Sequence, residues 1–580
     1  MRISKIGVIG AGTMGSGIAA LAASAGVPVE LLDVAGDDGS DAPARKGLER
    51  ALKARPAAFM DAARAALVRT GTIAGDLDRL RGCDLVIEAI VEQLEPKRDL
   101  YARLEPLLAP HAAVASNTSG IPIGALAEGR GEAFRRHFLG MHFFNPPRYL
   151  HLVELIPTAD TSADTLRGSQ RLVERVLGKG VVLARDVPGF VANRLGVYGL
   201  VLTIRLLERF GLDIDTVDAL TGTVLGRPRS ATFRTGDITG LDVLAHVTTG
   251  LARATGEEFA LPAWVNDLVA AGKLGEKSGA GFYHKDGKQI STLDWRSGEY
   301  RPQRTDALSP AIAALERQPL GERLRHVVDL PGTEGDFLRE LLFRTYHYVL
   351  ETAPRLAYDL PSVDHALEWG FGWEMGPIRQ IDAIGLDRVR AGLRALELPE
   401  PPLLRAARGA FYRVAGDSAE VLGVNGEYVE PPPMPGRITA ASLHRARGVV
   451  LDSPDAALLD MGDGVALFEF RTKMNTRTAG LLGQLHAALE RVGREGWHGL
   501  VIGNDDPRTF SAGADLTIVA RAAQAGDWKQ LDAAVRAFQQ ATASIRRAPF
   551  PVVVAPAGMT LGGGAELTLH ADRVQAHAEL

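Results

Sequence analysis

The beginning of the chain is a long apolar stretch that glycines interrupt at short intervals. Ile6 to Val29 carries no charge, and its length alone would suit a transmembrane helix or a signal peptide. Either of those segments would be rich in leucine, whereas this stretch contains six glycines. The pattern therefore predicts a buried strand over 5–10, a glycine turn, a small-residue helix over about 14–25 and a second strand over 28–33.

Similar apolar runs, separated by polar and glycine-rich loops, recur along the rest of the chain. Continuous runs of this length are typical of strands buried on both faces, as in sheets packed between helices. We therefore predict an α/β fold. The predicted strands are 84–90, 113–116, the first part of 140–147, about 150–156, 465–470, 500–503 and 551–555, and the predicted helices are about 190–210 and 476–492.

Composition and charge narrow the classes of protein to consider. The 580 residues are 46% hydrophobic and 23% charged, which is typical of a globular protein and leaves room for about four domains. The net charge of −5 gives no electrostatic basis for binding nucleic acid or an anionic membrane, so we predict no nucleic-acid partner and no membrane span. The single cysteine, Cys83, excludes an intramolecular disulfide and a cysteine-ligated metal site, and we predict no metal. We expect a cytoplasmic protein.

The glycine turn reads G-x-G-x-x-G and stands between a predicted strand and a predicted helix, as a dinucleotide-binding motif requires. Its glycines permit, in order, a tight turn, close approach of the backbone to a pyrophosphate, and close helix–strand packing. An acidic residue ends the second strand, where its charge favours the ribose of NAD and repels the 2′-phosphate of NADP. We therefore predict NAD as the cofactor. The residues predicted to hold it here are Gly10, Gly12, Thr13, Met14, Gly15 and Asp33.

Polar residues also follow the next two predicted strands. Glu92 and Lys97 come after 84–90, and Ser119 comes after 113–116. Open α/β sheets bind ligands at the carboxyl ends of their strands, so these three residues are candidates for lining a cofactor crevice. Taken singly, each is equally well explained as an ordinary polar loop residue or helix cap.

A histidine and a carboxylate lie on two neighbouring extended segments. On the strand at about 150–156, Glu154 shares one face with apolar residues, where a carboxylate is costly unless it is paired. His142 is the obvious partner. A carboxylate on one imidazole nitrogen fixes the tautomer and raises the basicity of the other nitrogen, which suits proton removal from an alcohol. The alternative is a buried histidine that pairs with a glutamate for structural reasons.

The motifs of the first half resemble a known family in unbroken order. GxGxxG, DLVIEAIVEQLEPK, SNTSG, MHFFNPP, LVELI, DVPGFVANR and KLGEKSGAGFYHK resemble the NAD-dependent L-3-hydroxyacyl-CoA dehydrogenases of fatty-acid β-oxidation. The resemblance implies a Rossmann-like NAD-binding domain over 1–184 and an all-α dehydrogenase C-terminal domain over 185–285. It also implies an acyl-CoA thioester substrate and a homodimer, with a thiolase as a candidate partner.

Carried over to this chain, the resemblance assigns roles to single residues. His142 matches the catalytic base and Glu154 its orienting carboxylate. Ser119 and Asn193 match polar residues around the substrate oxygen and the nicotinamide. The remaining residues that match cofactor contacts are Glu92, Lys97, Asn145 and Lys277.

One element of the helical domain occurs twice. D-x-x-G-L-D stands at 237–242 and again at 382–387. We infer a second, degenerate helical repeat over 335–398, between a linker at 286–334 and a proline-rich connector at 399–455. Because it lacks the dinucleotide and histidine motifs, we expect it to be a scaffold. Its aromatic residues favour a domain interface over a ligand cage, and these are Trp369, Phe371 and Trp373.

The last part of the chain carries a second pair of motifs. FSAGADL and LGGGAEL resemble the crotonase (enoyl-CoA hydratase/isomerase) superfamily, which implies a partial crotonase-like α/β domain over 456–580. In that family the backbone N–H groups at Ala514 and Gly563 would form an oxyanion hole, and Glu566 matches one of two hydratase carboxylates. The partner carboxylate would stand about twenty residues further on, but the chain ends fourteen residues past Glu566 (580 − 566). Asp572 and Glu579 stand in the wrong context, so we expect a truncated domain with an incomplete hydratase site.

Three functions remain from this reading. The leading one is NAD-dependent oxidation of L-3-hydroxyacyl-CoA to 3-ketoacyl-CoA in fatty-acid β-oxidation. The first alternative is a bifunctional enoyl-CoA hydratase and 3-hydroxyacyl-CoA dehydrogenase whose hydratase half is incomplete in this chain. The second alternative is a non-catalytic protein that binds acyl-CoA or NAD, against which the presence of both His142 and Glu154 argues.

Overall fold

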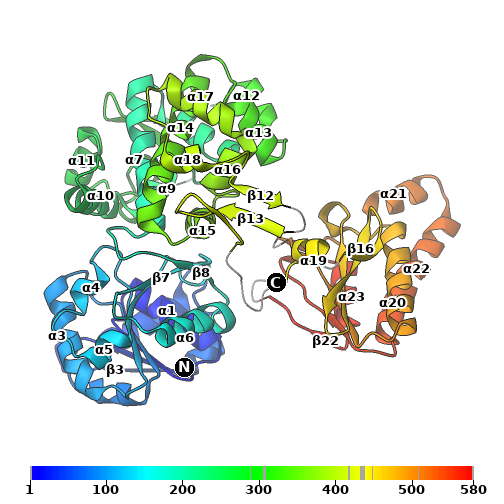
Figure 1. The fold of residues 1–580 in the computed structure, drawn as a ribbon, viewed down its shortest axis with the longest axis horizontal. Helices are drawn as coiled ribbons and strands as arrows, with labels where there is room; N and C mark the ends of the chain where they lie inside the picture. The colour runs from blue at the N-terminus through cyan, green and yellow to red at the C-terminus, as the bar shows by residue number, and fades with distance from the viewer. Residues whose placement is uncertain are drawn as a thin grey trace. The chain divides into compact units, whose positions relative to one another are not determined.

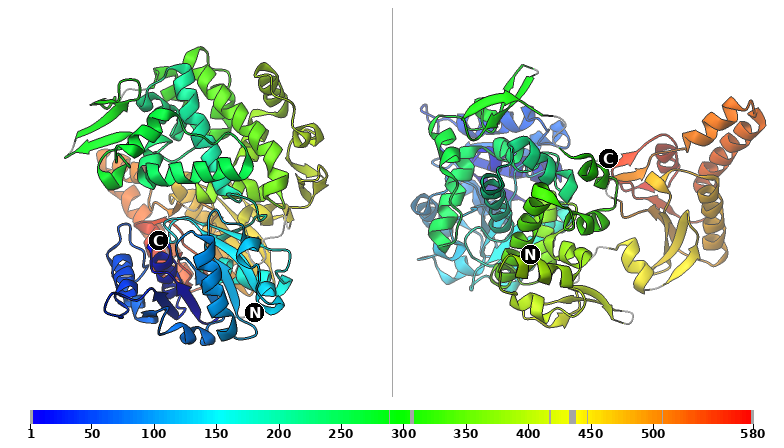
Figure 2. Two further views of the ribbon diagram at one scale, coloured as in Figure 1. Left: turned by 90° about the vertical axis from the view of Figure 1, so that its left-hand side faces the viewer. Right: turned by 90° about the horizontal axis from the view of Figure 1, so that it is seen from above.

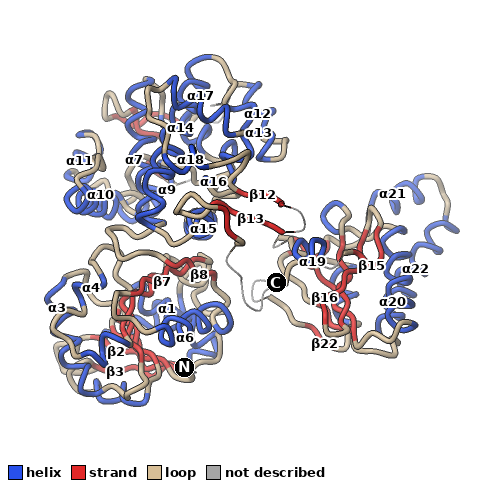
Figure 3. The backbone as a smooth tube through the Cα atoms, viewed as in Figure 1, coloured by secondary structure: helices blue, strands red, loops and turns tan. Residues whose placement is uncertain are grey.

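The computed structural model describes residues 3–287, 289–304, 308–415, 418–431, 438–446, 448–506 and 508–577. The chain forms two compact units (Figure 1). Unit 1 comprises residues 1–413 and 419–431, and unit 2 comprises residues 414–418 and 432–580. Figure 3 shows that strands are concentrated in the N-terminal part of unit 1 and in unit 2, whereas the rest of unit 1 is mainly helical.

Unit 1 begins with an eight-stranded sheet in the order β3-β2-β1-β4-β5-β6-β7-β8. Neighbouring strands are parallel except β6 and β7, which are antiparallel. The first three strands run outward from β1 to β3, and the chain then returns to place β4 on the other side of β1. The strand order therefore reverses between β1 and β4, and Rossmann-like sheets bind dinucleotides at this point. The strands are β1 (Ile6–Ile9), β2 (Val29–Asp33), β3 (Val68–Thr72), β4 (Leu85–Glu88), β5 (Ala113–Ser116), β6 (Phe138–Phe143), β7 (Leu152–Pro157) and β8 (Gly180–Leu183).

Both faces of this sheet are buried, which explains why its strands read as continuous apolar runs. In β4, Leu85 and Ile87 belong to one apolar core, together with residues of α1, while Val86 belongs to the other core, together with residues of α3. The helices of this part are α1 (Thr13–Ser24), α2 (Ala42–Lys53), α3 (Leu94–Leu104), α4 (Ile123–Leu126), α5 (Glu132–Arg136) and α6 (Ala163–Arg171), with 3₁₀ turns at Ala62–Leu67, Leu77–Gly82 and Glu105–Leu107 and a π-helical turn at Leu172–Val176.

The remainder of unit 1 contains two copies of one helical motif, each followed by a small three-stranded sheet (Figure 2, left, from green in the first copy to yellow-green in the second). The hydrogen bonds inside the copies match. Asp218 accepts a bond from the Tyr283 hydroxyl at 2.8 Å, and Asp364 accepts the equivalent bond from Tyr412 at 2.7 Å. The first copy contains α7 (Ala192–Phe210), α8 (Ile214–Thr221), α9 (Phe233–Thr239), α10 (Leu241–Thr255), α11 (Ala263–Ala270), β9 (Tyr283–Asp286), β10 (Gln289–Asp294) and β11 (Glu299–Pro302). The second contains α14 (Gly332–Leu356), α15 (Leu360–Gly370), α16 (Pro377–Ile384), α17 (Leu386–Ala395), α18 (Pro402–Ala406), β12 (Tyr412–Ala415), β13 (Ser418–Leu422) and β14 (Tyr428–Val429).

The second copy extends beyond the range expected from its repeated motif. Asp382 accepts hydrogen bonds from the backbone N–H groups of Phe411 and Tyr412, which lie in the expected connector 399–455. Short elements next to proline looked irregular in sequence, but α18 and β12–β14 fold as part of the repeat. The expected linker 286–334 likewise contains β10, β11, α12 (Pro310–Leu315) and α13 (Leu320–Val327). Residues 432–437 of the proline-rich stretch lie outside the described residues.

The aromatic residues of the second copy form an interface inside unit 1, as expected. A Cβ on Gly180 would lie 2.5 Å from the Trp369 ring, and one on Gly196 would lie 2.1 Å from the Phe371 ring. Trp373 lies under the guanidinium of Arg227, 4.5 Å from it. The second copy therefore packs on both the sheet and the first copy through close aromatic contacts.

Unit 2 is built on a six-stranded sheet in the order β15-β16-β17-β18-β20-β22, with a separate pair β19-β21. Its core lies between this sheet and helices α20 and α22. The elements are α19 (Ala440–Ala446), β15 (Val449–Asp452), β16 (Ala456–Gly462), β17 (Val465–Phe470), α20 (Ala479–Arg494), β18 (Gly499–Gly503), β19 (Thr509–Ser511), α21 (Leu516–Gln524), α22 (Trp528–Arg546), β20 (Val552–Val554), β21 (Met559–Thr560), α23 (Gly563–Leu569) and β22 (Arg573–Val574). Of the two later acids considered for a hydratase site, Asp572 is described and Glu579 lies outside the described residues.

Candidate active site

The turn after β1 has the shape that a bound pyrophosphate requires. Gly10 has φ +100°, and a Cβ there would lie 2.5 Å from the Ala89 carbonyl oxygen. A Cβ on Gly15 would lie 1.8 Å from the Gly10 oxygen, so α1 approaches the turn more closely than any side chain allows. A Cβ on Gly12 would meet nothing within 4 Å. The turn therefore leaves open backbone at Gly12, directly before the first turn of α1, whose N–H groups have no helical partners.

Asp33 ends β2 beside this turn. Its Oδ2 accepts a hydrogen bond from the Ala11 N–H at 2.9 Å, and its Oδ1 accepts one from the Val34 N–H at 2.7 Å. The carboxylate therefore fixes the glycine turn and keeps a negative charge next to it. That charge fits the ribose hydroxyls of NAD better than the phosphate of NADP.

A buried ion network follows β4 and holds three of the predicted residues together. Lys97 is 1% exposed, and its ammonium lies 2.6 Å from Glu88 Oε1 and 3.4 Å from Glu92 Oε2. Glu92 Oε1 accepts hydrogen bonds from the Ser119 N–H at 2.9 Å and from the Thr118 hydroxyl. Lys97 therefore pairs with two carboxylates, Glu88 and Glu92, and its predicted contact with the cofactor stays a prediction.

The charges of this network explain the titration of Glu92. Burial alone would raise the pKa of Glu92, but Lys97 and the hydrogen bonds from Thr118, Ser119 and Gly120 outweigh it and lower the pKa. Glu92 is therefore an anion, and it fixes the loop that carries Ser119.

Glu88 was not predicted, although it is the centre of this network. It is fully buried and accepts hydrogen bonds from Lys97, the Tyr101 hydroxyl and the Ser116 hydroxyl at 2.6–2.7 Å. The signal in the sequence was an acidic residue inside the apolar run DLVIEAI. Burial of a carboxylate requires several donors, and those donors come from different elements of the fold.

His142 and Glu154 form the expected pair. They are register partners on the antiparallel strands β6 and β7, and His142 Nδ1 lies 2.8 Å from Glu154 Oε2. His142 is 5% exposed and Glu154 is fully buried. The imidazole lies against the rings of Phe144 and Phe190, with centroid separations of 4.5 and 5.7 Å. Among the described residues, His142 Nε2 has no hydrogen-bond partner, so this nitrogen is free for a substrate proton.

The second oxygen of Glu154 connects the sheet to the helical part. Glu154 Oε1 accepts hydrogen bonds from the N–H groups of Val191 and Ala192 at 3.0 and 2.8 Å. The preceding residue, Phe190, has φ +47°, a left-handed conformation that costs about 1–2 kcal/mol for a residue with a side chain. This turn directs the two amides toward Glu154 at the start of α7. Asn193 is the next residue, in the first turn of α7, so the helix brings it near the pair.

Two further predicted cofactor contacts of unit 1 lie apart from these networks. Asn145 is exposed in the loop after β6. Lys277 lies in the 3₁₀ turn Glu276–Ser278 of the helical part and forms an ion pair with Asp242. Among the described residues, no hydrogen bond connects either side chain to the other predicted residues.

In unit 2 the two glycine-rich motifs lie side by side. Strands β19 and β21 pair, and the Leu561 N–H donates to the Ser511 carbonyl at 3.0 Å. A Cβ on Gly513 would lie 3.3 Å from the Gly563 nitrogen. Neither the Ala514 nor the Gly563 N–H donates a hydrogen bond to another described residue. Glu566 lies in the first turn of α23 and is exposed.

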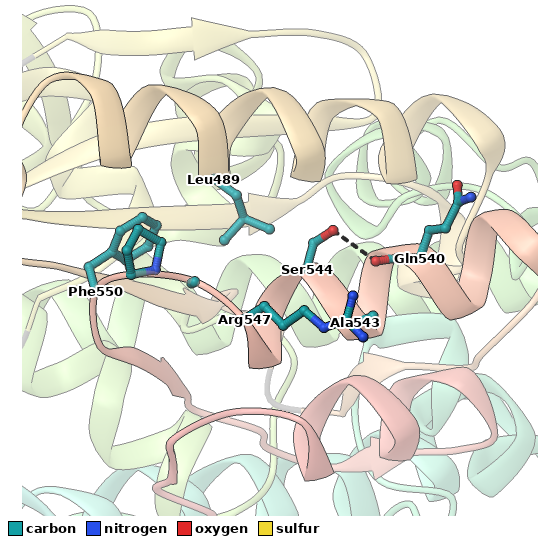
Figure 4. Close-up of a pocket in the computed structure, with 8 residues that line it drawn as sticks. Leu489, Gln540, Ala543, Ser544, Arg547 and Phe550 are labelled. Carbon is teal, nitrogen blue, oxygen red and sulfur yellow. Dashed lines mark hydrogen bonds between the residues drawn. The ribbon is translucent and has the colours of Figure 1, made fainter.

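A pocket of about 360 Å³ elsewhere in unit 2 lies between α20 and the end of α22 (Figure 4). Leu489, Ser544, Arg547 and Phe550 line it, and none of the predicted residues does. We assign this pocket no part in the chemistry.

In the part of the chain that the structure describes, no helix is long and apolar enough to cross a membrane, and no cluster of three or more metal-ligating side chains is found.

The fold and site of unit 1 define an NAD-dependent oxidoreductase with a buried histidine–carboxylate pair. Comparison with known sequences gives the family. The profile of the 3-hydroxyacyl-CoA dehydrogenase NAD binding domain matches residues 5–187, and that of the C-terminal domain of the same enzyme matches residues 189–285. The chain belongs to the 3-hydroxyacyl-CoA dehydrogenase family. The enoyl-CoA hydratase/isomerase profile matches residues 460–579.

Individual relatives agree with this assignment. A protein of Bacillus subtilis named "Probable 3-hydroxyacyl-CoA dehydrogenase" is 38% identical over the whole of this chain and 76% of its own length. The mitochondrial hydroxyacyl-coenzyme A dehydrogenase of Rattus norvegicus is 37% identical over 48% of this chain and 91% of its own length. The crystal structure of 3-hydroxybutyryl-CoA dehydrogenase from Escherichia coli, at 24% identity, covers 70% of this chain and 98% of its own with a TM-score of 0.53, which shows a shared fold.

Proposed function

We propose that unit 1 oxidises the 3-hydroxyl group of an L-3-hydroxyacyl-CoA to the 3-ketone, with His142 as the catalytic base. The observation that carries this assignment is the buried contact between His142 Nδ1 and Glu154 Oε2 at 2.8 Å. It leaves Nε2 as the only nitrogen available to a substrate, in a protein whose family oxidises this class of alcohol.

The residues of the site each have a task in this reaction. His142 Nε2 accepts the hydroxyl proton, and Glu154 keeps Nδ1 protonated and stabilises the imidazolium that forms. The rings of Phe144 and Phe190 exclude water from the imidazole, which strengthens its interaction with the carboxylate. We assign Ser119 and Asn193 to the substrate oxygen and the nicotinamide, since both lie on segments that the Glu92 and Glu154 networks hold in place.

The cofactor site in this proposal is the glycine turn and the crevice beside it. Gly12 and the start of α1 would hold the pyrophosphate, and Asp33 would hold the adenosine ribose. Thr13, Met14, Asn145 and Lys277 would complete the contacts, with Glu92 and Lys97 as support. When bound, NAD supplies the acceptor for the hydride that leaves C3 of the substrate.

The direct test is NADH formation by the purified chain with a series of L-3-hydroxyacyl-CoA substrates. We expect turnover with the L-enantiomers and none with the D-enantiomers, because a single base positions one face of the alcohol. Equal rates with both enantiomers, or faster turnover with NADP than with NAD, would contradict the proposal.

A second function is supported by unit 2. The adjacent, unbonded N–H groups of Ala514 and Gly563 support binding of an acyl thioester with its carbonyl oxygen between them. Glu566 on α23, three residues past Gly563, is then the candidate acid–base residue. Conversion of a 2-enoyl-CoA without NAD tests this function; its loss in Gly563→Pro, which removes one N–H, would support it, and unchanged conversion would contradict it.

We further propose a homodimer in the cytoplasm and a thiolase as the partner that consumes the product. The family resemblance supports these proposals, and the 3-ketoacyl thioester is the substrate class of thiolytic cleavage. Light scattering of the purified chain tests the first point: a monomer at micromolar concentration would contradict it.

A further inference from the structure

A buried arginine in unit 2 has no partner for its charge among the residues that the structure describes. Arg477 is 1% exposed, and its Nε, Nη1 and Nη2 are buried without a hydrogen bond to any described residue. Burial lowers the pKa of Arg477 to about 10, and the nearby charge of Glu566 acts in the opposite direction. The two side chains form no ion pair within 4 Å. A buried guanidinium in this state is costly, because its hydration is lost and nothing replaces it.

The backbone around Arg477 is fixed to the two glycine-rich motifs. The Arg477 N–H donates to the Gly513 carbonyl at 2.9 Å, and the Ala512 N–H donates to the Met474 carbonyl at 3.1 Å. Asn475 Nδ2 donates to the Thr509 carbonyl at 2.8 Å. The loop that carries Ala514 therefore fixes the backbone of Arg477, and the fold holds the Arg477 guanidinium beside the two glycine-rich motifs.

The space beside Gly563 faces this guanidinium. A Cβ on Gly563 would lie 3.5 Å from Arg477 Nη1, Arg477 Cδ and Phe538 Cε1. These are ordinary van der Waals separations, so a group of methyl size fits there without displacing anything. The half-buried ring of Phe538 also borders this space.

We propose that Arg477 binds a carboxylate group carried by an acyl thioester whose carbonyl oxygen lies at the Ala514 and Gly563 amides. The Ala514 and Gly563 N–H groups together bind the single carbonyl oxygen of the thioester. The planar guanidinium of Arg477 can instead donate hydrogen bonds to both oxygens of a carboxylate. The unit would then select thioesters of dicarboxylic acids over those of simple fatty acids. The inference rests on the second function proposed above, because it uses the same amides.

The test compares two thioesters of the same shape on the full chain. Malonyl-CoA carries a carboxylate where isovaleryl-CoA carries two methyl groups. We expect calorimetric titration to show malonyl-CoA binding at least about tenfold more tightly than isovaleryl-CoA, and we expect Arg477→Met to abolish that preference. Arg477→Met should unfold at the same or a higher temperature, since it removes an unpaired buried charge, and should leave NADH formation unchanged.

Three results would overturn the proposal: no preference in the wild-type chain, a preference that survives in Arg477→Met, or a clear loss of thermal stability in that variant, which would make the arginine structural. Gly563→Pro separates this inference from the function on which it rests, because proline is tolerated at the first position of α23 and removes the Gly563 N–H. If Gly563→Pro leaves the binding of both thioesters intact while Arg477→Met abolishes the preference, the carboxylate site stands and the amide site is wrong. If Gly563→Pro weakens both thioesters and Arg477→Met changes neither, the amide site stands and the carboxylate site is wrong.

Discussion

Replacement of Glu154 by glutamine isolates the role of its negative charge, because the two side chains have almost the same shape. In the wild-type chain, Oε1 accepts from the N–H groups of Val191 and Ala192, and Oε2 faces His142 Nδ1. A glutamine has one acceptor and one donor in place of two acceptors. If its oxygen keeps the two backbone bonds, its NH₂ group faces His142 Nδ1.

That orientation of the glutamine forces the imidazole into the wrong tautomer. The nitrogen Nδ1 must then accept a hydrogen bond, so Nε2 carries the proton and cannot remove one from the substrate. The reverse orientation would set the NH₂ group against two N–H donors and leave them unpaired, at a cost of about 1–3 kcal/mol each. We therefore expect the first orientation, with loss of general-base catalysis and of imidazolium stabilisation.

The expected fall in kcat/KM is about 10²–10⁴-fold, or about 3–5 kcal/mol of transition-state stabilisation. The assay is NADH formation with an L-3-hydroxyacyl-CoA, alongside fluorescence titration of NAD binding and thermal unfolding. NAD affinity should stay within about twofold, since in our account Glu154 does not touch the cofactor, and the folded state should lose only about 1–2 kcal/mol. Activity within tenfold of wild type would refute the reasoning, and a collapse of stability would show that the charge holds the fold together instead.

Three further predictions concern the cofactor turn, the buried ion network and the second helical copy. Asp33→Asn keeps an acceptor for the Ala11 N–H but removes the charge, so the ratio of kcat/KM for NAD over NADP should fall by about tenfold or more; an unchanged ratio would show that the charge does not select the cofactor. Lys97→Met leaves the Glu88 carboxylate buried without its cation and should lower the free energy of unfolding by about 3–5 kcal/mol in chemical denaturation, whereas a loss below 1 kcal/mol would contradict the network. Burial raises the pKa of Asp364 from 3.8 to about 7. The folded state therefore holds the protonated carboxyl more tightly than the unfolded state does, and the resulting stabilisation is complete below about pH 4 and is lost as the pH rises through about 7. The free energy of unfolding should fall by on the order of 4 kcal/mol over this pH range. Asp364→Asn should flatten this part of the pH–stability profile, and an equally steep profile in the variant would contradict the assignment.

Much of the Rossmann-like sheet was predictable because its strands are short, apolar and separated by glycine or polar turns. The strands β5 and β17 have the predicted bounds, and β1, α1 and β2 differ from prediction by one or two residues. The pairing of His142 with Glu154 was also predictable, because a period of two places the carboxylate among apolar side chains. The partner of Glu154 lies only twelve residues away in the sequence.

What remained unpredicted depends on contacts between distant elements. Glu88 sits in an apolar run, and three of its four hydrogen-bond donors come from two other elements, α3 and β5. The N–H groups of Val191 and Ala192 reach Glu154 only after the chain has passed through α6 and β8. The burial of Lys97 and the unpaired charge of Arg477 likewise follow from packing, which no spacing of residues along the chain encodes.

The most direct test of the central claim is the turnover of His142→Gln with NAD and an L-3-hydroxyacyl-CoA. Glutamine preserves polarity and approximate size but cannot accept and release a proton at neutral pH. We predict that NADH formation falls by at least about 10³-fold while NAD binding is retained. Turnover near the wild-type rate in a folded, NAD-binding variant would contradict the assignment of His142 as the base.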